Sequence, residues 1–384
     1  MSITGGEVLY RLLKFPVQSY LKWQFNIQIE DNPLRDETGP YLLLGNHVTN
    51  EDPILSSAYA NRLIRFIAGD ANQDHWLKKR LLALLESIPF SKNAGDAKSI
   101  RELVRHIKKG HPVGLYPEGG RNWDGATDSL VPSTGKLVKL LKVPVYAVIL
   151  KGGYLSRPRW AAYPRRGKLV LEIKKLFSRE AIADKTPEEI QALLVEKLDH
   201  DEYIWQRKNL IPFKGKKLAE RIERLLYICP QCHGINCLFS KGDHFSCRQC
   251  HSQYGVNQYG EIMGCEDFSD TVSWNKWQRS FLPEIIARGF SFANEEVLLS
   301  KKVIGVRPWR RHVVNVNFYP DRLEIRGKNL EERVPLAEVS GLSITFQDLV
   351  EFYRGKEKYR LLFDPQKHMS VKLFYDLMGK IVAE

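Results

Sequence analysis

The sequence predicts an α/β domain with a central sheet flanked by helices, then a small cysteine-bearing module, then a β-barrel-like domain with a C-terminal helix. Three observations support this order. Short apolar runs in the first half of the chain, such as residues 41–44, end at glycines and polar motifs, as buried strands of an α/β sheet do. Two Cys-x₂-Cys pairs follow in the middle of the chain, and apolar and polar residues alternate beyond about residue 290.

We expect four segments, since a chain of 384 residues is long enough for two or three domains and their connections. A capping box at residues 186–189 predicts a helix through about Leu198. A basic connector with proline and glycine follows at residues 209–217. The expected segments are an N-terminal helical segment over 1–24, the α/β domain over 25–220, the cysteine module over 225–265 and the β domain over 290–384.

Two polar motifs follow predicted strands of the α/β domain. Residues 41–44 lead into Asn46 and His47, and residues 113–116 repeat the strand pattern ahead of Glu118. Open α/β sheets bind ligands at the carboxyl ends of their strands. We therefore expect the two motifs to meet at neighbouring strand ends.

The pair of His47 and Asp52 has the composition of a general base and its orienting carboxylate. Free imidazole titrates near pH ~6.5, so a histidine can act as a neutral base near neutral pH. A carboxylate that holds one ring nitrogen leaves the other facing a hydroxyl, and such a base contributes on the order of 10²–10⁴ in rate. Glu118 and Arg121 lie three positions apart and add a second carboxylate and an anion-binding guanidinium.

Structural interpretations of the same residues are also open. Asp52 stands directly before Pro53, which fits a helix N-cap followed by proline at the first helical position. A cap alone would leave His47 as a surface loop residue, although capping and catalysis are compatible. Glu118 and Arg121 could pair only with each other on a turn.

Residues from about 20 to 215 resemble the glycerolphosphate acyltransferase superfamily, and most closely the 1-acylglycerol-3-phosphate acyltransferases. The Asn-His-x₄-Asp block of that family matches residues 46–52. Its Pro-Glu-Gly-Thr-Arg block matches residues 117–121, with Gly120 in place of the usual threonine, and its late Val-Pro-[Ile/Val] block matches residues 143–145. The resemblance implies the α/β fold and acyl transfer.

One family block departs from the usual pattern in this chain. That block normally ends in a phosphate-binding arginine, and here the corresponding stretch ends in Lys92. Lysine is a point charge and lacks the bidentate fork of arginine. The acceptor is therefore expected either to be bound differently or to differ from the usual lysophosphatidate.

The resemblance implies transfer of a fatty acyl group from a thioester to the hydroxyl of a lysophospholipid such as 1-acylglycerol-3-phosphate, in phospholipid biosynthesis. His47 would deprotonate the hydroxyl, Asp52 would orient His47, and the donor would be acyl-CoA or acyl-acyl carrier protein. Backbone N–H groups of the two-glycine turn would stabilise the charge that develops on the thioester carbonyl. Arg121 and Lys92 would hold the acceptor phosphate, and Glu118 would position Arg121 or the acceptor. The expected substrate-binding residues are Asn46, Lys92, Glu118, Gly119, Gly120 and Arg121.

The cysteine module contains two knuckles that fourteen residues separate, made by Cys229, Cys232, Cys247 and Cys250. This spacing predicts a four-cysteine zinc ribbon, because tetrahedral zinc takes four soft ligands and each knuckle supplies two. Four protein ligands close the site, so the Zn²⁺ is expected to be structural. Disulfides are the alternative, which a reducing cytosol disfavours. Cys237 and Cys265 are expected to be ordinary thiols outside the knuckles.

Zinc ribbons also bind nucleic acid, which gives a competing interpretation. The chain would then be a non-catalytic lipid- or nucleic-acid-binding protein on an acyltransferase-like scaffold. The ribbon is only modestly basic, so nucleic acid is the less favoured partner. The contact set would be Phe239, Lys241, His244, Phe245 and Arg248.

A net charge of +13 favours a polyanionic partner such as an anionic membrane surface. No apolar run approaches the ~18–20 residues that span a bilayer, and no signal peptide is visible, so we expect a cytoplasmic protein peripherally associated with the inner face of the cell membrane. Residues 8–23 mix basic, apolar and aromatic side chains and suit an interfacial helix, which Pro16 would kink or split. The alternative is a helix packed on the enzyme core. Residues 154–168 interleave arginines with aromatics and are a second candidate contact.

The C-terminal segment predicts antiparallel strands followed by an amphipathic helix. This order of elements resembles a pleckstrin-homology-like domain, which often binds lipid headgroups or peptides. The predicted strands are 313–319, 323–326, 333–336, 342–345 and 359–363, and the helix is 371–382. The candidate contact cluster is Arg307, Trp309, Arg310 and Arg311.

Overall fold

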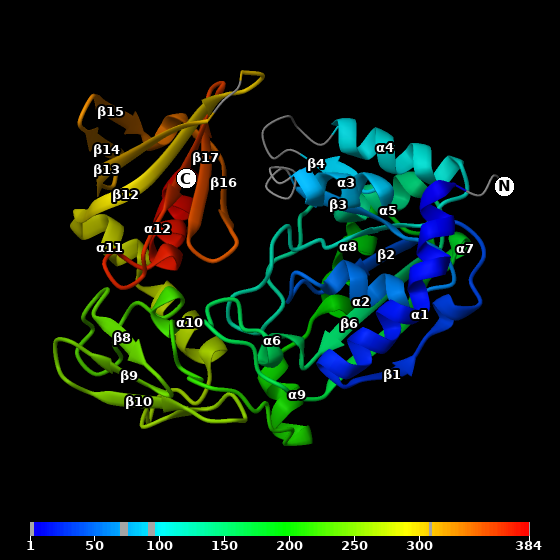
Figure 1. Ribbon diagram of the computed structural model, residues 1–384, viewed down its shortest axis with the longest axis horizontal. Helices are drawn as coiled ribbons and strands as arrows, with labels where there is room; N and C mark the ends of the chain where they lie inside the picture. Colours follow the sequence, from blue (N-terminus) through cyan, green and yellow to red (C-terminus); the bar gives the residue numbers. More distant parts are fainter. Residues whose placement is uncertain (1–3, 70–75, 91–96, 307–308, 384) are drawn as a thin grey trace. The chain divides into compact units, whose positions relative to one another are not determined.

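The computed structural model describes residues 4–69, 76–90, 97–306 and 309–383 (Figure 1). The chain divides into two compact units. The first comprises residues 1–159 and 164–214, and the second comprises residues 160–163 and 215–384. Among the described residues, no helix combines the length and the apolar character that crossing a membrane requires.

In the described part of the first unit, a seven-stranded mixed sheet has the order β1-β7-β6-β2-β5-β3-β4. The central strand β2 pairs in parallel with β5 on one side and with β6 on the other, so its carboxyl end has a neighbour on both sides. The predicted strands at residues 41–44 and 113–116 are β2 and β5. The strands are β1 (Ile27–Asp31), β2 (Leu42–Gly45), β3 (Arg65–Gly69), β4 (Ile88–Phe90), β5 (Val113–Leu115), β6 (Val145–Lys151) and β7 (Leu169–Phe177).

Helices α4, α5, α7 and α8 pack with β2 and β6 into one apolar core. The predicted capping box is present at the start of α8, because Thr186 Oγ1 accepts from Glu189 N and Glu189 Oε2 accepts from Thr186 N. The helices are α1 (Gly5–Phe25), α2 (Asp52–Ala58), α3 (Trp76–Leu84), α4 (Ala97–Lys108), α5 (Thr134–Leu141), α6 (Gly153–Ser156), α7 (Arg179–Ala183), α8 (Pro187–Leu198) and α9 (Glu202–Asn209).

Helix α1 lies alongside α2 (Figure 1) and is anchored to the backbone at the end of α2. Tyr10 Oη donates to the carbonyls of Ser57 and Ala60, and Lys14 Nζ also donates to Ala60. These contacts lie N-terminal to Pro16, and Gln18 makes the same type of contact beyond it, to the carbonyl of Ala58. The expectation that Pro16 splits this helix is wrong, since tertiary hydrogen bonds on both sides of the proline hold one continuous helix.

The second unit contains the cysteine module as a four-stranded sheet in the order β11-β10-β9-β8, followed by two short helices. Trp274 of the first of these helices is fully buried, and its indole N–H donates to the carbonyl of Ile228 beside the first knuckle. The elements are β8 (Leu238–Lys241), β9 (His244–Cys247), β10 (Gln253–Val256), β11 (Ile262–Met263), α10 (Thr271–Ser280) and α11 (Leu282–Arg288).

The described remainder of this unit is a seven-stranded antiparallel sheet in the order β15-β14-β13-β12-β18-β17-β16, with a C-terminal helix packed on its core. The five predicted strands and the helix are present, with shifted bounds. Two strands were not predicted, β12 and β17, whose sequences mix charged and apolar residues without regular alternation. The elements are β12 (Phe292–Val303), β13 (Arg310–Phe318), β14 (Arg322–Gly327), β15 (Leu330–Pro335), β16 (Val339–Thr345), β17 (Leu349–Arg354), β18 (Glu357–Leu362) and α12 (Val371–Ala383).

Candidate active site and metal centre

His47 and Asp52 form a hydrogen-bonded pair at the carboxyl end of β2. The Nδ1 of His47 lies 2.8 Å from Asp52 Oδ2. The Asp52 side chain is 2% exposed, whereas that of His47 is 23% exposed, so the imidazole has an open side. An Nδ1–H that donates to the carboxylate leaves Nε2 unprotonated and able to accept a proton.

The carboxylate of Asp52 is turned back toward the loop that carries His47. It accepts from the backbone N–H groups of Val48 at 2.7 Å and Thr49 at 3.0 Å, and from the Thr49 hydroxyl. Asp52 is itself the first residue of α2, with Glu51 at the N-cap position. The interpretation of Asp52 as a simple helix cap is therefore wrong, because its oxygens bind groups that precede the helix.

The second motif reaches His47 from the neighbouring strand, as the strand pattern predicted. Glu118 follows β5, and its Oε1 accepts from the backbone N–H of His47 at 2.6 Å. The ring of Tyr116 stacks on the imidazole, with ring centroids 4.4 Å apart. Tyr116 was not predicted to contribute to the site, although its place directly before the Pro-Glu-Gly motif was the available signal.

Glu118 is a half-buried carboxyl group whose second oxygen, Oε2, accepts from the backbone N–H of Asp128 at 2.9 Å. Burial raises the pKa of Glu118 to about 8, although its two backbone hydrogen bonds act in the opposite direction. Glu118 thus ties the His47 loop to the loop around residue 128. Its printed contacts are to backbone groups of the loop that carries the base, and its predicted role in positioning Arg121 or the acceptor stays a prediction.

Arg121 ends the motif that contains Glu118, and it lies close enough to Asp52 and Glu51 for their charges to act on it. Burial lowers the pKa of its guanidinium, while the negative charges of Asp52 and Glu51 act to raise it. Its backbone carbonyl accepts from Arg159 Nη1 at 2.6 Å, and the Arg159 guanidinium lies 4.3 Å from the centroid of the Trp123 ring.

Arg157 brings another guanidinium to this cluster through an ion pair with Glu51. Residues 154–168 were predicted to be a second candidate contact surface for an anionic membrane, a nucleic-acid backbone or an acidic carrier protein. That expectation is wrong for Tyr154, Arg159 and Arg165, which are buried.

Asn46 was predicted to bind substrate but holds the backbone of the adjacent strand. Its amide oxygen accepts from Leu150 N at 2.9 Å, and its amide nitrogen donates to Leu150 O at 3.2 Å. The residue is buried. This pairing fixes the end of β2 against β6 at the residue just before His47, which makes Asn46 a positioning residue.

The two glycines of the second motif differ in geometry. Gly119 has a φ of +71°, a left-handed conformation that favours glycine, and its N–H donates to Tyr116 O at 3.1 Å. Gly120 has open space where a Cβ would lie, so the usual threonine would fit at this position. Lys92, the expected partner of Arg121, lies outside the described residues, as does Arg307 of the C-terminal cluster.

The four knuckle cysteines come together as a cluster in which every pair of sulfur atoms lies within 4.8 Å. Backbone N–H groups of Gln249 and Cys250 point at Cys247 Sγ, at 3.3 and 3.5 Å, a pattern that stabilises a thiolate in a tight knuckle. All six cysteines of the chain are free thiols rather than disulfides. The set of four sulfurs from two turns fits a tetrahedral metal site.

Cys237 was expected to stand apart from this cluster but lies against it. Its Sγ is 3.3 Å from Cys247 Sγ and donates to the carbonyl of Gly234 at 3.1 Å. The spacing of Cys237 from either knuckle matches no second Cys-x₂-Cys pair, so sequence spacing alone did not reveal its place.

The set of residues proposed for nucleic-acid contact is partly buried. Phe245 packs between Tyr254 and Trp274 in the interior of the module, so its ring is not available for stacking on a base. Phe239 is exposed at the surface, with the guanidinium of Arg248 5.3 Å from its ring centroid. The predicted nucleic-acid contact set therefore has one fewer aromatic ring that a base could stack on.

The stability of the protein should depend on the protonation of Glu118. The raised pKa means that the folded state keeps a proton between pH 4.5 and about 8 that the unfolded chain releases. The stabilisation from this group is complete below pH 4.5 and is lost as the pH rises through about 8. Denaturant unfolding across this range should show a pH-dependent decline that Glu118→Gln removes, with the exposed Glu196→Gln as control. Parallel curves for the wild type and Glu118→Gln would contradict the assignment.

Metal content should separate the knuckle cysteines from their neighbour. The wild type and Cys237→Ser should each bind about one zinc ion per chain, because a tetrahedral site needs only four ligands. Cys229→Ser and Cys250→Ser should lose most of the metal. Elemental analysis of the purified proteins makes the test, and loss of the metal from Cys237→Ser would show that this fifth thiol is a ligand.

Comparison with known proteins places the site within a family domain. Residues 25–151 match the family model described as Acyltransferase. The chain is similar to the solved 1-acyl-sn-glycerophosphate (LPA) acyltransferase PlsC from Thermotoga maritima, at 18% identity and a TM-score of 0.44, over 52% of this chain and 79% of that chain. It is also similar to the Legionella pneumophila ATPase DotB, at 10% identity and a TM-score of 0.26, over 46% of this chain and 57% of that chain.

No curated protein matches the chain. The two structural scores are too low to carry an argument, so the assignment rests on the family model, which spans both motifs. The identities of the cysteine module and of the β domain lie outside that match and remain predictions. Residues 25–151, with His47, Asp52, Glu118 and Arg121, belong to the acyltransferase family.

Proposed function

We propose that this protein is a peripheral membrane O-acyltransferase that transfers a fatty acyl group from a thioester to the hydroxyl of a lysophospholipid such as 1-acylglycerol-3-phosphate. The observation that carries the proposal is the 2.8 Å contact between His47 Nδ1 and Asp52 Oδ2 on a partly open imidazole. The donor is acyl-CoA or acyl-acyl carrier protein. Phospholipid biosynthesis is the process that such a reaction serves.

The proposed reaction begins at the open nitrogen of His47. Nε2 takes the proton of the acceptor hydroxyl as its oxygen attacks the thioester carbonyl, and Asp52 stabilises the resulting imidazolium. The tetrahedral intermediate then collapses, the carbon–sulfur bond breaks and the imidazolium returns its proton to the leaving thiolate. The products are an ester and a free thiol. The Gly119 N–H is engaged with Tyr116 O, so the Gly120 N–H is the backbone donor proposed for the developing oxyanion.

The acceptor phosphate is proposed to bind Arg121, with Lys92 as a second cation. The partial burial of Arg121 supports this role, because a partly desolvated guanidinium attracts a phosphate more strongly than a fully exposed one does. Glu118 and Asn46 act through other groups: Glu118 holds the backbone N–H of His47, and Asn46 holds β6.

Helix α1 is proposed to bring the enzyme to an anionic membrane on the cytoplasmic side. On its anchored face, Tyr10 donates a hydrogen bond to a carbonyl of α2. On its other side the exposed fractions of Leu12, Phe15 and Trp23 are 70%, 76% and 69%. Exposed Arg11 and Lys22 lie on the same helix and suit anionic headgroups. The Cys₄ cluster is proposed to hold a structural Zn²⁺ that stabilises the small module around it.

Replacing His47 by alanine should lower acyl transfer by about 10²–10⁴-fold, because the general base is lost while substrate binding remains. Purified protein would receive labelled acyl-CoA or acyl-acyl carrier protein with lysophosphatidate in anionic vesicles. His312→Ala, a histidine in β13 of the other unit, is the matched control and should keep full activity. Undiminished turnover by His47→Ala would refute the proposed base, and no turnover by the wild type with either donor would refute this choice of substrates.

Replacing the exposed aromatic residues of α1 should weaken membrane binding. Burying one large apolar side chain contributes roughly 1.5–3 kcal/mol, so Phe15→Ser with Trp23→Ser should lower vesicle affinity by about tenfold or more. Co-sedimentation with vesicles containing anionic phospholipid measures the change. Ile204→Ser removes an exposed apolar side chain of α9 and serves as control. Equal vesicle binding by the double variant and the control would exclude α1 as the contact surface.

A further inference from the structure

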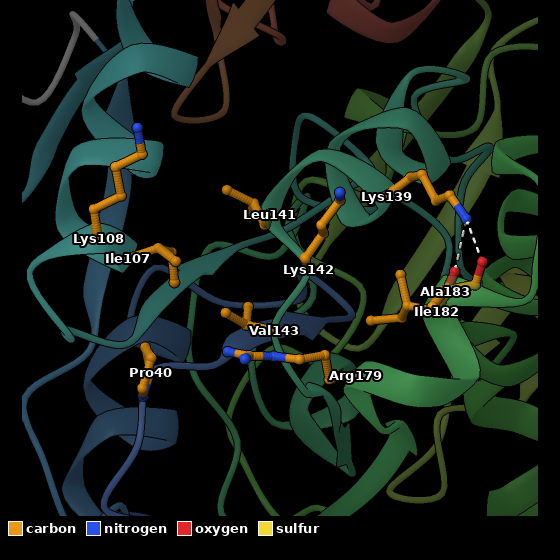
Figure 2. Close-up of a pocket in the computed structure, with 10 residues that line it drawn as sticks. All are labelled: Pro40, Ile107, Lys108, Lys139, Leu141, Lys142, Val143, Arg179, Ile182 and Ala183. Atoms are coloured by element: carbon orange, nitrogen blue, oxygen red, sulfur yellow. Dashed lines mark hydrogen bonds between the residues drawn. The ribbon is translucent and has the colours of Figure 1, made fainter.

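A pocket of about 590 Å³ lies in the first unit, and Figure 2 shows the residues that line it. It is at the end of the sheet opposite His47. Pro40 lines it just before β2, and Val143 lines it just before β6, whereas His47 follows the other end of β2. Seven residue steps from Pro40 to His47 correspond to roughly 20 Å of extended chain. The pocket is therefore separate from the acyl-transfer site. Its volume lies within the roughly 300–1,000 Å³ range of small-molecule sites.

The floor of the pocket is apolar and belongs to the core of the domain. It is formed by Ile107 at the end of α4, Leu141 at the end of α5, Val143 and Ile182, all of which are buried. Such a floor offers contact to a hydrocarbon chain and few polar groups to a small hydrophilic ion.

The rim of the pocket is cationic, and no acidic residue is among those that line it. Lys139 is already occupied, because its ammonium donates to the carbonyls of Ile182 at 3.0 Å, Ala183 at 2.9 Å and Lys185 at 2.7 Å. A ligand could contact the other three cations of the lining, Lys108, Lys142 and Arg179. Within the described ranges, none of these three forms an ion pair with a carboxylate. Figure 2 shows the Arg179 side chain extending across the pocket toward Val143.

Helix dipoles explain only part of this charge. Lys108 ends α4 and Lys142 is the C-cap of α5, where a cation interacts favourably with the helix dipole. Arg179 is at the opposite kind of position, the first residue of α7, where the dipole opposes a positive charge. All three residues are exposed, and Glu180 is the carboxylate that acts electrostatically on Arg179 from outside the lining. The lining itself therefore presents three cations and no carboxylate to an anionic ligand.

We infer that this pocket binds a single-chain anionic amphiphile, with the hydrocarbon chain on the apolar floor and the carboxylate or phosphate against Lys108, Lys142 and Arg179. Two sources share this chemistry, a long-chain fatty acid and a lysophosphatidate. The site lies apart from His47 and is additional to the proposed acceptor site. The inference stands on the pocket alone and does not require the proposed acyl transfer.

Equilibrium binding to the full-length protein, with no acyl donor present, tests this inference. The ligands are a long-chain fatty acid and lysophosphatidate below their micelle concentrations, with neutral monoacylglycerol and inorganic phosphate for comparison. The variant is Lys142→Glu with Arg179→Glu. The control is Lys136→Glu, an exposed lysine of α5 that does not line the pocket. Circular dichroism confirms that each variant is folded.

The double variant should lose one binding site, or bind the anionic amphiphile about tenfold or more weakly, because it removes two charge-assisted contacts. Binding of neutral monoacylglycerol should not change in the double variant. Whichever ligand loses affinity, the fatty acid or the lysophosphatidate, identifies the headgroup that the pocket binds. Identical isotherms for the double variant and Lys136→Glu would overturn the inference. Inorganic phosphate that binds as tightly as the amphiphiles would also overturn it, since the floor would then contribute nothing. Absence of acyl transfer in the wild type would refute the proposed choice of substrates without changing these binding results.

Discussion

The hydrogen bond between His47 and Asp52 is the interaction on which the rest of the site depends. Asp52 reaches the imidazole because its oxygens also hold the N–H groups of Val48 and Thr49, which bends the loop after β2 back over the start of α2. Glu118 holds the backbone of His47 from the other side. One histidine is thus fixed through its side chain by one carboxyl group and through its backbone by another.

This constraint requires close packing at the end of β2. A Cβ at Gly45 would lie 2.6 Å from Val148 Cγ1 and 3.1 Å from a ring carbon of Tyr116. Any larger residue would therefore push β2 away from β6 or displace the ring that stacks on His47. Asn46 completes the junction by pairing with both backbone polar groups of Leu150. The residues that precede the base are thus selected for fit rather than for chemistry.

The sequence was sufficient for features that depend on local spacing. The β2 strand, the capping box of α8 and the two cysteine knuckles follow from neighbouring residues. The pairing of His47 with Asp52 followed from residue chemistry, and the family resemblance supported it. Contacts between distant segments were not predictable in the same way. Glu118 was predicted to position Arg121 or the acceptor, and its contacts to backbone groups at positions 47 and 128 were not foreseen. Cys237 reaches the knuckles through the folding of β8 against β9. Such contacts depend on register and loop path, which residue spacing does not encode.

The anchoring of α1 has a mechanical consequence for the site. Tyr10, Lys14 and Gln18 bind carbonyls at the carboxyl end of α2, while the opposite end of this seven-residue helix is Asp52. A short hydrogen-bonded helix moves as a rigid rod, so a displacement of α1 at one end is transmitted to the orienting carboxylate at the other. The position of α1 and the alignment of the imidazole are therefore coupled.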